Sequence, residues 1–535
     1  MFGFLLKRYE NSGILNISFS MVKEGACVQE THPALPYAIE LKGLSKRFGK
    51  VQANNNIHLT VQQGEILALL GENGSGKTTL MNMLSGIYKP DSGQIFLHGR
   101  EVNIRSPREA IQLGVGMIHQ HFKLVDVLTA RENILLGEGG RKCRDLSGLC
   151  ARFGLDVSLD KKIYDMSVSE KQTVEILKVL ARGADILILD EPTAVLTPQE
   201  TDRLFHILRK MREDNRAVVI ITHKLNEVMA ISGRVTILRR GESVGTVETA
   251  RTHVQHLTEL MVGRPVDLKI RRAEVEPGEV LLDVKEVTVK GAEGTDRLKN
   301  VSFTLQEGEI LGVAGVAGSG QKELCEAIAG LQPIGAGNIT LQGQRIDGLT
   351  PREIIQKGIS MSFIPEDRLG MGLVGGMNLT DNMLLKTYRD QKGFLLSRKP
   401  ARALAKRLIE RLQISTPGVH IPVKKLSGGN VQKVLLGREI DSNPKVLITA
   451  YPVRGLDINS SHTIYDLLTE QKKRGVGILF IGEDLDVLLE LSDRIMVMCG
   501  GRVTAIVPAM FATKELLGMK MTDALRAEKS EETYV

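Results

Sequence analysis

The chain has 535 residues, too many for one hydrophobic core, and a prior of roughly 150 residues per domain predicts three or four compact units. With 42% hydrophobic and 25% charged residues its composition is that of a globular protein, and no window reaches the roughly 18 uncharged apolar residues of a membrane span. The net charge of +7 is modest and does not identify a partner. The five cysteines are scattered and form no C-x-x-C pair, which favours a reducing compartment over a zinc site or a disulfide framework.

The first 37 residues are predicted to be a disordered extension. Their opening lacks the order of a signal peptide, because Lys7, Arg8 and Glu10 interrupt the apolar run. Met21 is therefore a second candidate for the translation start.

A phosphate-binding loop follows a β-type segment at residues 61–70 and precedes a helical pattern. Its sequence, GENGSGKTT, fits G-x-x-x-x-G-K-[ST], in which glycine N–H groups surround phosphate oxygens. Lys77 is expected to reach the outer phosphates, and the Thr78 hydroxyl can bind Mg²⁺. Phe48 lies where its ring can stack on adenine, although a core position is the alternative reading. The nucleotide-binding residues predicted in this region are Phe48, Gly71, Glu72, Asn73, Gly74, Ser75, Gly76, Lys77, Thr78 and Thr79.

Carboxylates follow a second apolar strand, ILILD, which ends at Asp190 and continues into Glu191. Phosphoryl transfer uses one carboxylate to hold Mg²⁺ and a neighbouring group to orient water, so we assign these roles to Asp190 and Glu191, respectively. Gln120 can contact both the metal and the attacking water, and His223 ends the next apolar strand, where it can contact the γ-phosphate. The predicted catalytic residues are Glu191, His223, Gln120 and Lys77, and the predicted metal residues are Thr78, Gln120 and Asp190.

The chain repeats this arrangement. A second loop, GVAGSGQKE, begins at Gly315, 244 residues after Gly71, and the later strands recur 260 residues apart, as at Asp190 and Ala450. The short apolar runs alternate with helical patterns, which is typical of an α/β fold with parallel sheets buried on both faces. The growing offset places about sixteen extra residues in the second half, mostly within 388–422, and the polar stretch 267–279 separates the halves.

The second half also contains LSGGNVQK immediately before a helical pattern. A hydroxyl, small residues and the positive end of a helix dipole suit a bound phosphate, with an ordinary capped turn as the alternative reading. The residues assigned to this motif are Ser427, Gly428, Gly429 and Gln432.

Together, these motifs resemble an ATP-binding-cassette (ABC) ATPase with two cassettes in tandem, over residues 38–515. The resemblance implies P-loop NTPase domains, each with a parallel-sheet core, an antiparallel β subdomain and a helical subdomain. It also implies that LSGGNVQK is the family's signature motif, and that each ATP lies between the phosphate loop of one cassette and the signature motif of the other. The expected divisions are an extension at 1–37, cassettes at 38–266 and 280–517, a linker at 267–279 and a charged tail at 518–535.

In this arrangement the first-half loop faces the complete second-half signature. The other site, between the second-half loop and the first-half signature, lacks the family's catalytic and metal-binding residues. That site should not hydrolyse ATP at a useful rate, because loss of a general base alone typically costs about 10² to 10⁴ in rate. Nucleotide can still bind at the second loop, because the backbone donors of Gly318 and Gly320 remain. The replacements are Gln321 for the lysine, Glu366 for the glutamine, Ala450 and Tyr451 for the Asp-Glu pair, Glu483 for the histidine, and Val168 and Ser169 for the signature glycines.

Within the family, the segments GSGQ, PEDR and GEDL resemble importer ATPases for simple sugars and nucleosides, with the nucleoside branch favoured. This resemblance implies hydrolysis of ATP with Mg²⁺, two integral-membrane permease subunits, an extracytoplasmic solute-binding protein and peripheral association with the cytoplasmic face of the membrane, without a nucleic-acid partner. The alternatives are a soluble tandem-cassette translation factor acting on ribosomes and a scaffold without turnover. The short linker and the depleted site argue against the first, and Glu191 and His223 against the second.

Overall fold

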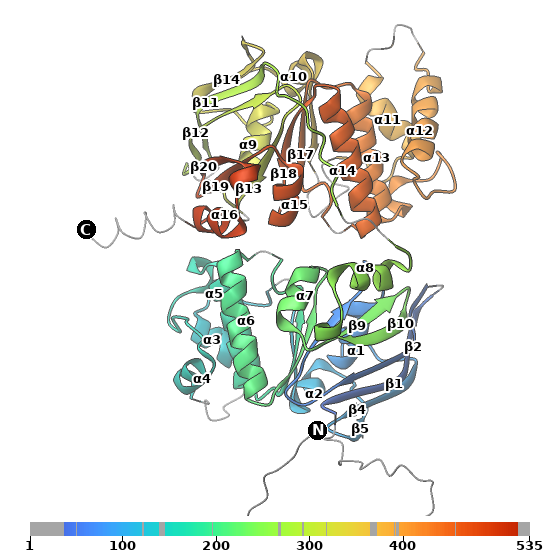
Figure 1. Cartoon of the computed structure of the whole chain (residues 1–535), viewed down its shortest axis with the longest axis vertical. Helices are drawn as coiled ribbons and strands as arrows, with labels where there is room; N and C mark the ends of the chain where they lie inside the picture. Colours follow the sequence, from blue (N-terminus) through green and yellow to red (C-terminus); the bar gives the residue numbers. More distant parts are fainter. Residues whose placement is uncertain are drawn as a thin grey trace, which may run out of the picture.

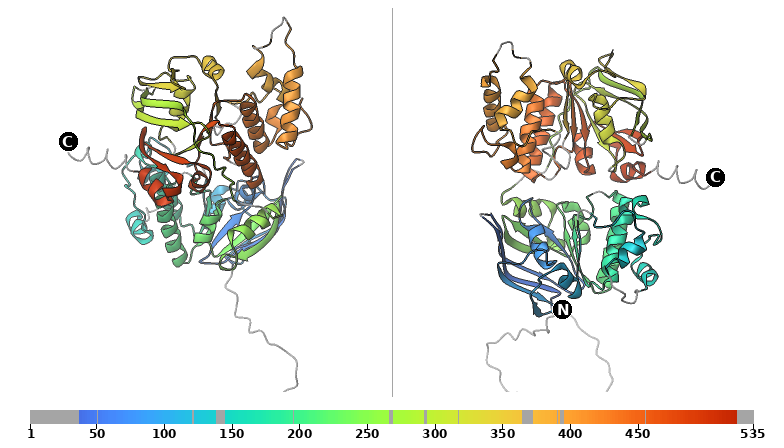
Figure 2. Two further views of the ribbon diagram at one scale, coloured as in Figure 1. Left: turned by 45° about the horizontal axis from the view of Figure 1, so that its top comes forward. Right: turned by 180° about the vertical axis from the view of Figure 1, so that it is seen from behind.

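The computed structural model describes residues 37–49, 51–119, 122–137, 145–194, 196–265, 269–291, 294–316, 318–363, 372–389, 391, 395–454 and 456–522. The chain forms two similar blocks stacked along its long axis, the N-terminal half below and the C-terminal half above in Figure 1. The view from behind in Figure 2 shows the same two blocks, one above the other. The expected α/β class is confirmed, since each block combines a mixed sheet, an antiparallel sheet and packed helices.

In the first half, an antiparallel sheet has the order β2-β1-β4-β5, and a six-stranded sheet has the order β10-β9-β3-β8-β7-β6. The latter is parallel apart from β10. The strands are β1 (Ile39–Phe48), β2 (Val51–Val61), β3 (Ile66–Leu70), β4 (Ser92–Leu97), β5 (Arg100–Val102), β6 (Val115–Ile118), β7 (Ile186–Asp190), β8 (Ala217–Ile221), β9 (Arg234–Arg239) and β10 (Glu242–Glu248). The helices are α1 (Lys77–Leu84), α2 (Pro107–Gln112), α3 (Ala130–Leu135), α4 (Leu146–Phe153), α5 (Val168–Ala181), α6 (Pro198–Glu213), α7 (Leu225–Ile231) and α8 (Val254–Val262), with 3₁₀ turns η1 (Ile163–Asp165) and η2 (Thr249–Arg251).

The second half repeats both sheets, with the orders β12-β11-β14-β15 and β16-β17-β18-β13-β19-β20. Its strands are β11 (Val280–Lys290), β12 (Asp296–Gln306), β13 (Ile310–Ala314), β14 (Ala336–Leu341), β15 (Gln344–Arg345), β16 (Ile359–Phe363), β17 (Val446–Ala450), β18 (Gly477–Ile481), β19 (Arg494–Cys499) and β20 (Arg502–Pro508). Its helices are α9 (Gln321–Ile328), α10 (Pro351–Lys357), α11 (Leu379–Thr387), α12 (Lys399–Arg411), α13 (Gly428–Asp441), α14 (Ile458–Lys473), α15 (Leu485–Leu491) and α16 (Lys514–Lys520), with η3 (Val423–Lys425) and η4 (Ala509–Phe511). The 13-residue α12 stands where the first half has the 8-residue α4, which accounts for five of the added residues.

The central strands are short, apolar and buried along their whole length, as in β3, β7 and β8. Helices cover both faces of such parallel sheets, so the chain needs no polar face there. Because parallel strands end at the same edge, β3 and β7 deliver the phosphate loop and Asp190 to one place.

The segment 61–70, expected as one β-type run, is divided between two sheets. β2 ends at Val61 and β3 starts at Ile66, with Gly64 in the left-handed region at φ +66° between them. A Cβ at Gly64 would lie 2.9 Å from the Asn215 side chain, so a glycine is needed at this turn.

Equivalent positions of the two halves meet across their boundary. Asn226 donates a hydrogen bond to Asp486 at 3.1 Å, and these residues are 260 positions apart, the same offset as the repeated strands. Two further hydrogen bonds cross the boundary. Gln199 in α6 donates to the Glu515 carbonyl oxygen in α16, and Arg264, just after α8, donates to Asn459 in α14. The halves are therefore related by a pseudo-two-fold axis near Asn226 and Asp486.

The linker lies against the second half. Arg272 donates to the Ser492 carbonyl oxygen at 2.7 Å. The buried Lys472 ammonium donates to the Ala273 carbonyl oxygen at 2.8 Å and to Asp493 at 2.7 Å. Residues 270–273 are thus held as part of the second block.

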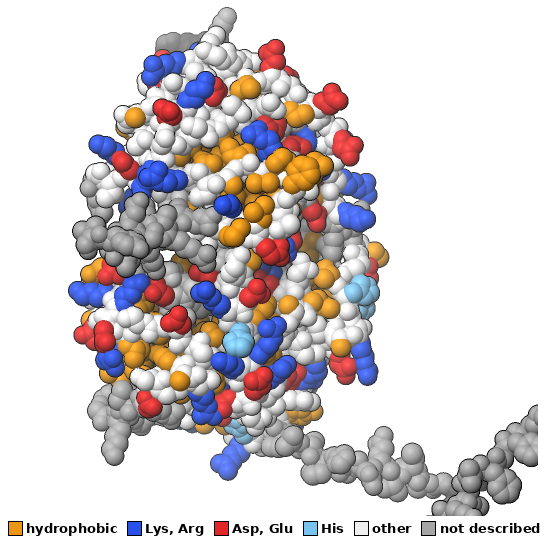
Figure 3. Space-filling model, turned by 60° about the vertical axis from the view of Figure 1, so that its left-hand side comes forward, with side chains coloured by type: hydrophobic (Ala, Val, Ile, Leu, Met, Phe, Trp, Pro, Cys, Tyr) orange, Lys and Arg blue, Asp and Glu red, His pale blue; other side chains and the backbone are white. Residues whose placement is uncertain are grey.

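Among the described residues, no helix is both long and apolar enough to span a bilayer. Figure 3 shows acidic and basic side chains interspersed on one face of the molecule, with hydrophobic side chains gathered over the second half. That face has no block of a single charge, in keeping with the modest net charge.

Candidate nucleotide site

The first phosphate loop offers unpaired backbone donors at the start of a helix. α1 begins at Lys77, and its N-cap residue Gly76 is left-handed (φ 98°, ψ 4°) without a side-chain cap. A Cβ at Gly76 would lie 2.3 Å from the Ala53 carbonyl oxygen, so only glycine fits. Helix N-terminal N–H groups in this arrangement bind phosphate oxygens.

Lys77 is buried within the loop, with a relative exposure of 7%. Its ammonium donates to the carbonyl oxygens of Gly71 and Glu72, at 2.6 and 3.0 Å. Burial lowers the pKa of Lys77, although the nearby carboxylates act in the opposite direction. The buried Ser75 hydroxyl has no hydrogen-bond partner in the part of the chain that the structure describes. Buried donors of this kind fit a polyphosphate ligand.

Asp190 and Thr78 come together from β7 and α1, where the Thr78 hydroxyl acts to lower the pKa of the Asp190 carboxylate. Burial raises the pKa of Asp190 to about 6, and the charge of Glu191 acts in the same direction. A positive ion at this point would favour the ionised carboxylate, so the pair fits a hard cation such as Mg²⁺.

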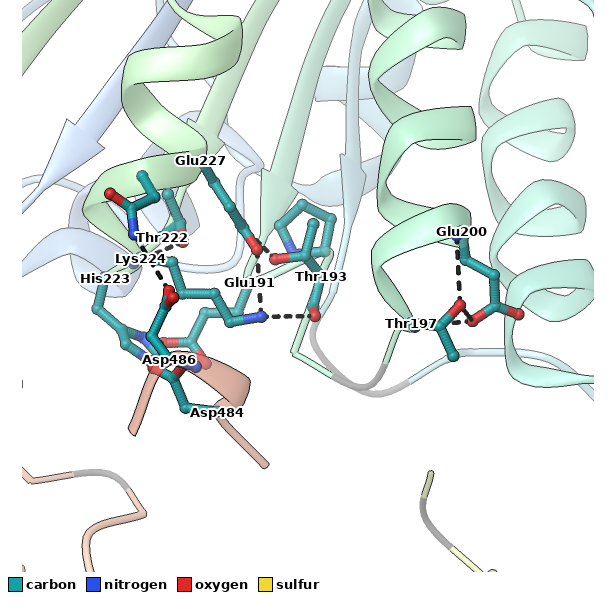
Figure 4. Close-up of polar contacts among 12 residues, drawn as sticks. Glu191, Thr193, Thr197, Glu200, Thr222, His223, Lys224, Glu227, Asp484 and Asp486 are labelled. Atoms are coloured by element: carbon teal, nitrogen blue, oxygen red, sulfur yellow. Dashed lines mark hydrogen bonds and ion pairs between the residues drawn. The ribbon is translucent and has the colours of Figure 1, made fainter. Parts of the chain in front are cut away.

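Glu191 turns away from β7 in a left-handed conformation, with φ 47°, and its N–H donates to the Ile221 carbonyl oxygen at 2.8 Å. Its carboxylate lies 3.1 Å from Nδ1 of His223, at the end of β8 (Figure 4). This hydrogen bond is the main reason that the pKa of Glu191 lies below its usual value, although burial acts against it. The structure therefore brings the predicted base and the predicted histidine together, with the base ionised.

Ser427 in the second half and Ser167 in the first half stand at equivalent positions of the two signature motifs, 260 residues apart, and they are used differently. Ser427 is the N-cap of α13, yet it makes no side-chain cap to the helix, and its oxygen accepts from Asn430 at 2.8 Å. Ser167 forms a capping box with Glu170, and Lys161 pairs with that carboxylate at 2.9 Å. The N-terminus of α5 is thus neutralised by its own glutamate, whereas that of α13 keeps N–H groups for a ligand.

Glu170 was missed by the sequence reasoning, although the S-x-x-E spacing could have indicated it. Gln432, which the sequence analysis assigns to nucleotide binding, is buried. Its side chain is 1% exposed, and its amide donates to the Arg454 carbonyl oxygen at 3.2 Å. One helical turn after the helix start, Gln432 faces the core.

The first loop and the second signature approach each other across the boundary between halves. The Asn73 amide donates to the Leu456 carbonyl oxygen at 3.5 Å. The Leu456 side chain lies against Gly429, where a Cβ would be 3.4 Å away. Burial raises the pKa of Glu72, and the charge of Asp457 adds to the shift. The loop of one half thus lies near the signature of the other.

Phe48, at the end of β1, is 43% exposed and packs edge-to-face on Tyr88, with ring centroids 5.2 Å apart. The Lys46 ammonium lies over the same ring, 5.6 Å from its centroid, and stacking of Phe48 on a base stays a prediction. Gln120 and Glu366 lie outside the described residues.

The second loop keeps the backbone of the first but not its chemistry. The Gln321 amide donates to the Val316 carbonyl oxygen at 3.2 Å, as Lys77 does to the equivalent carbonyl of Glu72. Tyr451 has the left-handed φ of Glu191, at 53°, and burial raises its pKa to about 12. Arg454 pairs with Glu483 at 3.4 Å, where the first half has its histidine.

Comparisons with known proteins agree with this geometry. A family model described as "ABC transporter" matches residues 54–194 and 298–452. The nucleoside import ATP-binding protein NupA of Lactococcus lactis subsp. cremoris is 42% identical, covering 90% of this chain and 97% of its own length. The glucose import ATP-binding protein TsgD13 of Haloferax volcanii is 39% identical, covering 90% of this chain and 95% of its own length.

One solved structure resembles both halves together. It is the archaeal ribosome recycling factor aABCE1 in complex with the ribosomal stalk protein aP1, with a TM-score of 0.58, 18% identity, and coverage of 87% of this chain and 90% of that one. At this identity the likeness concerns the fold alone, so it does not support the ribosome-associated alternative.

Proposed function

Because this chain belongs to the ABC transporter family and is an ATPase subunit of an importer, we propose that it hydrolyses ATP at one composite site. The site combines the first-half loop, Glu191 and His223 with Ser427 of the second half. The observation that carries the proposal is the Glu191–His223 hydrogen bond beside the buried Lys77, which has no equivalent residues in the second half.

The chain's own residues divide the work. The loop N–H groups and Lys77 bind and orient the phosphates, and Phe48 stacks on the base. Glu191, ionised and hydrogen-bonded to His223, accepts a hydrogen bond from the attacking water and orients it. Ser427 and the N-terminus of α13 stabilise the transferring phosphoryl group.

We propose that Thr78 and Asp190 hold Mg²⁺, together with Gln120. When bound, the ion would neutralise charge on the β- and γ-phosphates. The second half has Lys322 and Ala450 at the equivalent positions, which supports a single metal site.

We further propose that the chain divides into two cassettes, 38–266 and 280–517, which are joined by the linker 267–279. The extension 1–37 precedes them, and the tail 518–535 follows them. Closure around the site would move two permease subunits at the cytoplasmic face of the membrane, through contacts near Gln120 and Glu366. An extracytoplasmic binding protein would deliver the solute. The similarity to NupA favours a nucleoside, and the similarity to TsgD13 keeps a simple sugar as the second candidate.

Uptake by proteoliposomes tests this proposal. The chain would be reconstituted with its permease partners and binding protein, with ATP on the chain's side. We expect accumulation of labelled adenosine but not labelled glucose, and none with Glu191→Gln. Glucose accumulation instead would reassign the solute, and uptake that persists in Glu191→Gln would overturn the proposed site.

A further inference from the structure

A closed polar cluster lies beside the Glu191–His223 pair (Figure 4). The Thr193 hydroxyl donates to Glu227 Oε2 at 2.5 Å, and the Lys224 ammonium donates to the Thr193 carbonyl oxygen at 3.0 Å. Lys224 also pairs with Glu227 Oε1 at 3.1 Å. Each of the three residues thus contacts the other two, and we refer to them as the Thr193 clamp.

The Thr193 clamp joins two segments that carry the catalytic pair. Thr193 lies two residues after Glu191, on the turn that follows β7, and is 2% exposed. Lys224 directly follows His223, and Glu227 lies in α7. Hydrogen bonds in which one group is charged are stronger than neutral ones, more so where water is excluded. The clamp therefore fixes the turn after β7 to the start of α7.

The second half lacks the Thr193 clamp. At the positions 260 residues later it has Val453, Asp484 and Val487, which cannot form this set of bonds. The turn itself is nevertheless the same, since Tyr451 N–H donates to Ile481 at 2.8 Å, as Glu191 N–H does to Ile221. The backbone thus forms without a clamp, and the clamp is present only in the half that has the carboxylate and the histidine.

We propose that Thr193, Lys224 and Glu227 are positioning residues that hold the Glu191 carboxylate and the His223 ring in register for hydrolysis. The inference rests on the proposed role of Glu191. Without the Thr193 clamp, the turn after β7 keeps its backbone bond to Ile221 but loses its side-chain links to the start of α7. A displacement of about 1 Å in a catalytic group can cost about 10²-fold in rate.

The decisive variant is Thr193→Val combined with Glu227→Val. The second half packs valines at both equivalent positions, so the variant is expected to fold with an unchanged Tm. We expect kcat for ATP hydrolysis to fall at least about 10-fold. KM for ATP should stay unchanged, because Lys77 and the phosphate loop are untouched. The single variant Thr193→Ser keeps the hydroxyl and should therefore retain the wild-type kcat.

A matched control lies nearby. Thr197 and Glu200 have the same side-chain chemistry, with the Thr197 hydroxyl 3.0 Å from the Glu200 carboxylate, but they form a capping box at the start of α6. Thr197→Val should lower Tm through loss of the cap and leave kcat unchanged. The clamp variant should show the reverse pattern.

The outcomes are separable. An unchanged kcat in the double valine variant overturns the proposed positioning role of the Thr193 clamp, even if Glu191→Gln is inactive. A loss of kcat accompanied by a lowered Tm assigns the three residues to stability and also overturns the proposed positioning role. Turnover that survives in Glu191→Gln overturns the proposed function, and the clamp with it.

Discussion

The two halves share backbone conformations at equivalent positions and differ in chemistry. Gly76 and Gly320 have φ values of 98° and 100°, and Glu191 and Tyr451 have φ values of 47° and 53°. Left-handed conformations are unfavourable for residues with side chains, yet the second half keeps one with no carboxylate to present. The scaffold is thus maintained by sheet and helix packing, whereas the reaction depends on a handful of side chains that can be lost without loss of the fold.

The largest difference between the halves should appear on substitution at Glu191. Glu191→Gln removes the ionised base and should lower kcat by about 10² to 10⁴. Tyr451→Phe, at the equivalent position, should leave kcat unchanged in the same ATPase assay. Similar losses from both substitutions would contradict the model of one hydrolytic site.

The signature serines should separate activity from stability. Ser427→Ala removes a hydroxyl assigned to the phosphoryl group and should lower kcat roughly 10²-fold, as loss of one transition-state donor does. Because Ser427 does not cap α13 with its side chain, Tm should be retained. Ser167→Ala should instead cost about 1 kcal/mol of unfolding free energy, with kcat retained. Steady-state kinetics and thermal melting measure both, and the opposite pattern would reverse the assignment of the two signatures.

Metal binding should also distinguish the halves. With a non-hydrolysable ATP analogue, titration with Mn²⁺ followed by electron paramagnetic resonance should find one metal site, at Thr78 and Asp190. Thr78→Ala should weaken that site by about 10-fold. A second site of similar affinity would show that Lys322 and Ala450 do not prevent metal binding.

The smallest effect is expected from restoring the missing lysine. Gln321→Lys should return charge to the second loop, but Tyr451 still offers no base there. The ATPase rate of Glu191→Gln should therefore not recover when Gln321→Lys is added. Recovered turnover would show that the lysine alone limits the second half.

Much of this arrangement could be predicted because it is local in sequence. The phosphate loop has its own motif, and the apolar strands place Asp190 and His223 at one edge of a parallel sheet. The inward direction of Gln432 depends on which face of α13 is packed, which the motif does not indicate. The Thr193 clamp joins residues 34 positions apart, and only the folded chain brings Thr193 and Glu227 together. The capping role of Glu170 was local and could have been recognised.

The linker held by Lys472 and Arg272 has a consequence for pairing. If the halves were separate proteins, two first halves could associate and would combine complete loops with capped signatures, while two second halves would combine the reverse. Neither homodimer would contain a whole site. A short connection anchored to the second half gives the two different halves a high effective concentration for each other, and so it selects the one pairing in which Lys77 meets Ser427.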